Sequence, residues 1–103
     1  MENDIRLFLD DVREAPPDWC LMRSVKDVID ALKTSSVSII SLDHDLGDSA
    51  IYGTGYDVIL WIENEVATNN FNPPEIRVHS ANPPAAKKMR AGIEKIYSLL
   101  KNR

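Results

Sequence analysis

Cysteine is scarce in this sequence. Cys20 is the single cysteine among 103 residues, so the chain cannot form an internal disulfide or offer a pair of cysteine ligands to a metal. Long apolar runs are also missing, and none approaches the roughly 20 residues that a bilayer-spanning helix needs. Basic charge is short as well, because 12 lysines and arginines stand against 16 aspartates and glutamates, a formal net charge of −4. Such a chain lacks the basic face that broad, sequence-independent duplex binding requires.

What is present suffices for a small folded protein. Apolar residues make up 44% and charged residues 27% of the chain, which is ordinary for a globular protein and argues against disorder. The length predicts a single domain over residues 1–103. The chain begins Met-Glu-Asn-Asp, and this acidic start is unlike a secretory signal peptide. We therefore expect a cytoplasmic protein that does not bind membranes.

Short apolar runs alternate with amphipathic stretches. Strands are predicted at residues 5–9, 19–22, 37–42 and 75–78. Helices are predicted to begin after the capping residues Ser24, Thr54 and Asn82. The stretch 46–55, with three glycines, is predicted to be a loop whose glycines supply flexibility or positive φ. Alternating strands and helices predict an α/β protein with a four-stranded parallel sheet, right-handed crossovers and helices on both faces.

Polar residues gather where three of the predicted strands end. The first strand is followed by Asp10 and Asp11, the third by Asp43, His44 and Asp45, and the fourth by His79 and Ser80. In an open parallel sheet, ligands bind outside the carboxyl ends of the strands, at the switch point in strand order. Both histidines of the chain follow strands in this way. The pattern predicts a ligand site at this edge of the sheet.

Aspartates brought to one edge repel each other. A pair of like charges about 4 Å apart costs roughly 4 kcal/mol at an effective dielectric near 20. Protonation of one carboxyl, with a raised pKa, offsets this cost, and so does a divalent cation. Because carboxylate oxygens are hard ligands, we expect Mg²⁺ or Mn²⁺ at a site formed by Asp10, Asp11, Asp43 and Asp45.

The remaining candidates each have a structural alternative. Arg13 is a candidate for binding phosphate oxygens through its guanidinium, and equally a solvated loop residue. Ser80 and Asn82 are candidate substrate contacts, but Ser80 is as well explained by a loop cap and Asn82 better by a helix N-cap. A lone histidine at a strand end is commonly a partly buried residue bonded to backbone. The pairing of His44 with His79 favours a function.

An acidic pair after the first strand, an aspartate after the third and a serine after the fourth are similar to the receiver domain of two-component signalling. By this resemblance Asp10 and Asp11 help to hold Mg²⁺, Asp43 takes the phosphoacceptor position and Ser80 the hydroxyl position. The chain departs from the receiver pattern at two points. The lysine that ends the fifth strand of receivers has no counterpart, and the first receiver helix is reduced to the loop 13–18. Ordinary phosphoacceptor signalling is therefore disfavoured.

Longer strings resemble a divergent branch of that fold. Leu-Phe-Leu-Asp-Asp-Val-Arg, Ser-Leu-Asp-His-Asp-Leu-Gly, Thr-Gly-Tyr-Asp and Val-His-Ser-Ala-Asn-Pro are similar to motifs of the cyclic-phosphate processing receiver domain of bacterial and phage proteins. The resemblance spans nearly the whole chain. It implies a receiver-like, flavodoxin-like three-layer α/β sandwich with a truncated sheet. It also implies the processing of cyclic phosphates, such as the 2′,3′-cyclic ends met in RNA repair.

The residues suit that chemistry. Opening a cyclic phosphodiester needs an activated water, charge neutralisation and a proton for the leaving oxygen. A cation held by Asp10, Asp11 and Asp43 would serve the first two needs. Histidine titrates near pH 6.5 in general, so His44 and His79 are the candidate acid and base, and Asp43 is the third candidate catalytic residue. Asp45 either orients His44 or binds the metal.

Two functions follow from these residues and the resemblance. The first is a metal-assisted phosphoesterase. The alternative is a non-catalytic, degenerate receiver module that binds a phosphorylated ligand or a protein partner. The expected partner is a small phosphorylated ligand or an RNA terminus.

Overall fold

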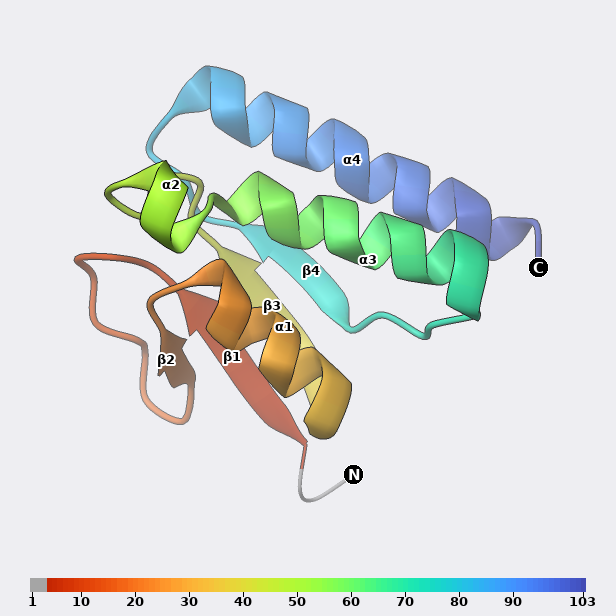
Figure 1. The fold of residues 1–103 in the computed structure, drawn as a ribbon, viewed down its shortest axis with the longest axis horizontal. Helices are drawn as coiled ribbons and strands as arrows, with labels where there is room; N and C mark the ends of the chain where they lie inside the picture. Colours follow the sequence, from red (N-terminus) through yellow and green to blue (C-terminus); the bar gives the residue numbers. More distant parts are fainter. Residues whose placement is uncertain (1–3) are drawn as a thin grey trace.

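The computed structural model describes residues 4–103, and four parallel strands form one sheet in this part of the chain (Figure 1). The strands are β1 (Ile5–Leu9), β2 (Cys20–Met22), β3 (Val37–Leu42) and β4 (Glu75–Val78). The helices are α1 (Val25–Thr34), α2 (Ser49–Tyr52), α3 (Gly55–Asn69) and α4 (Pro83–Lys101). The strand order is β2-β1-β3-β4. The predicted α/β class and four-stranded parallel sheet are confirmed.

The three long helices begin where the sequence predicts. Ser24 caps α1, since its side chain accepts the backbone N–H of Asp27 at 3.2 Å. The start of α3 is fixed by the backbone N–H of Thr54, which donates to the carboxylate of Asp57 at 2.9 Å. Asn82 caps α4 by accepting a backbone N–H of the first turn at 3.2 Å. Each cap satisfies a donor that the helix itself leaves unpaired.

The predicted loop 46–55 contains a helix that the sequence did not reveal. The short α2 is capped by Asp48, whose carboxylate accepts the backbone N–H of Ala50 at 2.9 Å. A four-residue helix with no buried side chain leaves no apolar periodicity to detect. The left-handed turns on either side of α2 fall on Gly47 and Gly53, with φ of 84° and 75°.

One face of the sheet carries the main core. The buried apolar cluster takes Leu7, Leu9, Ile40, Leu42 and Ile76 from the strands, and Val28, Ile59, Ile62, Met89 and Ile96 from the helices. The steps from β2 to β3 and from β3 to β4 cross the sheet in the same direction, so right-handed crossovers place α1 and α3 on the same face. Figure 1 shows both helices in front of the strands. Among the described helices, none combines the length and hydrophobicity of a bilayer span.

The opposite face, which we call the open face, presents Arg6, Phe8, Ile39, Ser41 and Arg77. Phe8, Ile39 and Ser41 are buried there but lie outside the helix-covered cluster. No helix within residues 4–103 covers this face, so the described layers number two rather than the predicted three. The crossovers that carry α1 and α3 run in one direction across the sheet. The connection from β1 to β2 runs in the opposite direction, and it is a loop and not a helix.

Candidate functional site

The site lies at the carboxyl ends of the two central strands. From β1 the chain passes to β2 on one side, and from β3 it passes to β4 on the other, so β1 and β3 flank the switch point of the sheet. Asp10 and Asp11 directly follow β1, and Asp43 directly follows β3. The backbone N–H of Asp43 donates to the carbonyl of Leu9 at 2.9 Å, which joins the two strand ends.

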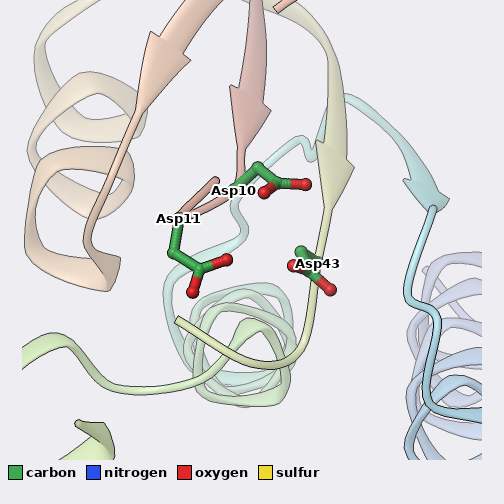
Figure 2. A group of neighbouring side chains, drawn as sticks. All are labelled: Asp10, Asp11 and Asp43. Atoms are coloured by element: carbon green, nitrogen blue, oxygen red, sulfur yellow. The ribbon is translucent and has the colours of Figure 1, made fainter. Parts of the chain in front are cut away.

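Three carboxylates converge at this point (Figure 2). Asp10, Asp11 and Asp43 each offer an oxygen, and these oxygens all lie within 4.8 Å of one another. Asp10 is fully buried, whereas Asp11 and Asp43 are partly exposed. We call these residues the acidic cluster. The convergence predicted for them from the sequence is what the structure shows.

Asp10 is held by hydrogen bonds to both carboxylate oxygens. Its Oδ1 accepts the backbone N–H groups of Val12 and Arg13, each at 2.9 Å, and its Oδ2 lies 3.0 Å from Nε2 of His79. Burial raises the pKa of Asp10, but the two backbone donors and the imidazole together outweigh burial, so the pKa lies below its ordinary value. Asp10 is therefore ionised and fixed in orientation.

Asp43 has the opposite electrostatic character. Burial, and after it the negative charge of Asp10, raise the pKa of the Asp43 carboxyl above its ordinary value. The backbone N–H of His44, which donates to Asp43 Oδ1 at 2.9 Å, offsets only part of this rise. The cluster thus carries a repulsion that a bound cation would relieve.

His79 reaches across the open face from the end of β4. Its ring stacks on Phe8 with centroids 4.2 Å apart and planes 4° from parallel, and its Nδ1 lies 2.7 Å from Oγ of Ser41. Since the ionised Asp10 only accepts, Nε2 of His79 carries a proton toward it, and Nδ1 shares a hydrogen bond with the hydroxyl of Ser41. Both ring nitrogens are thereby engaged.

Ser41 and Phe8 are site residues that sequence reasoning missed. Ser41 is a buried hydroxyl in the otherwise largely apolar strand Val-Ser-Ile-Ile-Ser-Leu. A buried hydroxyl needs a hydrogen-bond partner, so a serine in an apolar strand could have indicated a polar contact at this position. Nothing in one sequence indicates the stacking of Phe8 on His79, because Phe8 lies on β1, His79 follows β4, and these two strands are not neighbours.

Two arginines secure the loop that follows β1. Nη1 of Arg13 donates to the carbonyl of His79 at 2.8 Å and lies 3.9 Å from Oδ2 of Asp10. Nη1 of Arg23 donates to the carbonyl of Asp10 at 3.0 Å. The side chain of Arg13 is 50% exposed, so part of its guanidinium faces solvent beside the acidic cluster.

His44 and Asp45 form a second hydrogen-bonded pair. Nδ1 of His44 lies 2.8 Å from Oδ1 of Asp45, and the Asp45 side chain is largely exposed. Asp45 is outside the group of three carboxylates that the described residues bring together. Because the carboxylate accepts, Nδ1 of His44 carries a proton, and a neutral ring would keep the lone pair of Nε2 available. Of the two roles expected for Asp45, the structure places it where it orients His44.

Ser80 and Asn82 take part in backbone hydrogen bonds after β4. Oγ of Ser80 accepts the backbone N–H of Asn82 at 3.1 Å, and the Asn82 side chain caps α4. These contacts match the structural alternative for each residue. A direct substrate contact by either one stays a prediction.

Gly55 fixes how close α3 comes to the site. A Cβ at this position would lie 1.9 Å from the backbone oxygen of Asp43 and 2.8 Å from Cε of Met89. No positive φ accompanies Gly55, unlike Gly47 and Gly53, so the predicted loop role is wrong for Gly55. Glycine is needed here because the helix start touches the backbone that carries Asp43.

The acidic cluster fits a hard divalent cation. It offers carboxylate oxygens, no sulfur ligand is near since the sole cysteine lies on β2, and His79 has both nitrogens engaged. Mg²⁺ and Mn²⁺ bind through a few carboxylates together with water and phosphate oxygens. Asp10, Asp11 and Asp43 are therefore the residues that would hold such an ion.

Comparison with known proteins agrees with these motifs. A model of the family described as the cyclic-phosphate processing receiver domain matches residues 5–95. This chain belongs to that family. The match includes the four strands, the acidic cluster and both histidines, so the resemblance stated from the motifs is confirmed for this cyclic-phosphate processing receiver domain. Searches of curated proteins and of solved structures found no match.

Proposed function

We propose that this cyclic-phosphate processing receiver domain is a metal-assisted phosphoesterase that hydrolyses cyclic phosphates, with the 2′,3′-cyclic ends of RNA or nucleotides as its substrate class. The observation that carries the proposal is the acidic cluster, whose ligand oxygens lie within 4.8 Å of one another, with a histidine beside each of its two anchored aspartates. Membership of the family supports the substrate class.

Asp10, Asp11 and Asp43 would hold Mg²⁺ or Mn²⁺. Such an ion, when bound, neutralises charge on a phosphate and lowers the pKa of a bound water. The chain's own part is to fix the aspartates in place. The two backbone donors and His79 orient Asp10, and the start of α3 packs against the backbone of Asp43.

His44 is the residue to which we assign proton transfer. Asp45 holds the proton on Nδ1, which leaves Nε2 able to accept one. Hydrolysis forms a bond between a water oxygen and phosphorus, breaks one ring bond between phosphorus and a ribose oxygen, and moves one proton from the water to that oxygen. His44 takes the proton from the water in this scheme.

His79 and Arg13 have supporting roles. Because both of its ring nitrogens are engaged, we assign His79 as a positioning residue that acts through Asp10. Arg13, half exposed and anchored on the carbonyl of His79, provides guanidinium donors that phosphate oxygens can accept.

The test is a turnover screen of 2′,3′-cyclic and 3′,5′-cyclic nucleotides with Mg²⁺ or Mn²⁺, and again with a chelator. We expect release of monophosphate from the 2′,3′ substrates with metal only. His44→Ala should lower kcat at least about a hundredfold, since general acid–base catalysis contributes that much or more. Asp43→Asn should also lower kcat, because it removes a carboxylate that would hold the metal, whereas Asp30→Asn on the exposed surface of α1 is the matched control.

The two histidines are separated by their conservative variants. His79→Asn keeps an amide donor toward Asp10 and should recover part of the kcat that His79→Ala loses, whereas His44→Asn should recover none. The fall in kcat toward low pH should persist in His79→Asn. Binding of the cyclic nucleotides without any turnover would instead support the alternative of a non-catalytic module.

A further inference from the structure

The open face is hollowed beside β1, β3 and β4. The hollow has a volume of about 360 Å³ and is lined by Arg6, Trp19, Ser38, Ile39, Glu75 and Arg77. No residue of the described helices lines it. The proposed function makes no use of this hollow.

The hollow is positively charged in an acidic protein. Nε of Arg77 binds the carboxylate of Glu75 at 2.8 Å, and both side chains are more than half exposed. Arg6 is exposed, and within residues 4–103 no ion pair or hydrogen bond engages its guanidinium. One net positive charge therefore remains in the hollow, although the whole chain carries −4. Charge of this sign favours an anionic ligand.

An aromatic row connects the hollow with the acidic cluster. Trp19, in the hollow, meets Phe8 edge to face with centroids 6.2 Å apart, and Phe8 stacks on His79, which binds Asp10. Arg6 lies on β1 and Asp10 directly follows it, four residues further along the chain, about 13 Å at the usual rise per strand residue. A short oligonucleotide spans such a distance and a mononucleotide does not.

We propose that the open face binds the nucleotides that precede the cyclic end of a single-stranded RNA. The guanidiniums of Arg6 and Arg77 bind backbone phosphates, and the indole of Trp19 stacks on a base. The inference rests on the proposed function for the end itself. RNA is the polymer concerned because a 2′,3′-cyclic phosphate requires the 2′-hydroxyl.

A protein partner fits the open face less well. Phe8 and Ile39, the large apolar strand residues of this face, are each only 9% exposed, and Trp19 is partly buried, so little apolar surface remains for a second chain to bury. Exposed arginines and a single hollow instead suit a short, charged ligand, and the acidic balance of the chain limits the length of RNA that it can hold.

The experiment compares a uridine trinucleotide ending in a 2′,3′-cyclic phosphate with uridine 2′,3′-cyclic monophosphate. Binding is measured by titration in chelator, which prevents turnover, at several salt concentrations. We expect the protein to prefer the trinucleotide, and Arg6→Gln to lower this preference about tenfold, as loss of a charged hydrogen bond does. The slope of log affinity against log salt should fall by about 0.7, the value for one phosphate contact on a single strand.

Lys33→Gln is the matched control, because it removes the same charge from the exposed end of α1, on the helix-covered face. Arg77→Gln is a second test, and it should act in the same direction as Arg6→Gln. Equal affinity for the two ligands, or a trinucleotide affinity and salt slope that Arg6→Gln and Arg77→Gln leave unchanged, would overturn the inference. A dimer in sedimentation that Arg6→Gln dissociates would do so too, by assigning the face to a second copy.

The outcomes keep this inference apart from the proposed function. If the trinucleotide binds through Arg6 but neither ligand is hydrolysed when metal is added, the open face stands and the phosphoesterase fails. If both ligands are hydrolysed and Arg6→Gln leaves the KM for the trinucleotide at its wild-type value, the phosphoesterase stands and the open face fails.

Discussion

Replacing Asp43 by asparagine should stabilise the metal-free protein and abolish its response to metal. The ligand oxygens lie within 4.8 Å of one another, and two unit charges at that separation repel by about 3.5 kcal/mol at an effective dielectric of 20. Asp43 and Asp11 are partly exposed, and two backbone N–H donors partly compensate the charge of Asp10, so the repulsion that remains after screening is about 1–2 kcal/mol. The asparagine oxygen can still accept the backbone N–H of His44.

The assay is urea unfolding, repeated in chelator and in excess Mg²⁺. In chelator, Asp43→Asn should raise the free energy of unfolding by about 1–2 kcal/mol, which is about 5–10 °C in Tm for a domain of this size. In Mg²⁺ at a hundred times its Kd, the wild type should gain about 2.7 kcal/mol. Asp43→Asn should gain little, because a neutral amide replaces one of three carboxylates.

Asp45→Asn is the neighbouring control, since Asp45 lies outside the acidic cluster and should leave the Mg²⁺ response intact. The reasoning is refuted if Asp43→Asn is less stable than the wild type in chelator, or if the two proteins gain equally from Mg²⁺.

Three further predictions concern the groups around the cluster. Ser41→Ala should cost about 1–3 kcal/mol in urea unfolding, because it leaves the part-buried Nδ1 of His79 without its hydrogen-bond partner; an unchanged midpoint would contradict that hydrogen bond. Gly55→Ala should cost about 3 kcal/mol and slow any turnover, since its Cβ would meet the backbone oxygen of Asp43; normal stability would show that α3 can shift. The lowered pKa of Asp10 means that its ionised form favours the folded state, so this stabilisation is complete above the ordinary value of 3.8 and is lost as pH falls through the lowered value. Unfolding followed against pH should therefore be less acid-sensitive in Asp10→Asn than in the wild type, and equal sensitivity would contradict the assignment.

Much of the fold follows from local signals. The four strands are short apolar runs that end at polar residues, and three helices begin at Ser24, Thr54 and Asn82, whose caps are local interactions. These signals need no knowledge of tertiary contacts. The two-layer arrangement was not predictable in this way, because it depends on which direction each connection steps across the sheet.

The acidic cluster was predictable because parallel strands bring their carboxyl ends to one edge. The hydrogen bonds of His79 were not, since they depend on the ring crossing β3 to reach β1. Asp43 and Asp45 are two residues apart in the sequence, yet only Asp43 joins the cluster. Both residues follow β3, where side chains no longer alternate regularly between the two faces of the sheet. The roles of these residues in catalysis stay predictions.

The most direct measurement follows the phosphorus of uridine 2′,3′-cyclic monophosphate by ³¹P NMR in the presence of the protein. The cyclic-phosphate resonance should disappear and a monophosphate resonance should grow with Mg²⁺ or Mn²⁺, and neither should change in chelator or with Asp43→Asn. A cyclic resonance that persists in the wild-type protein with either metal would contradict the proposed phosphoesterase.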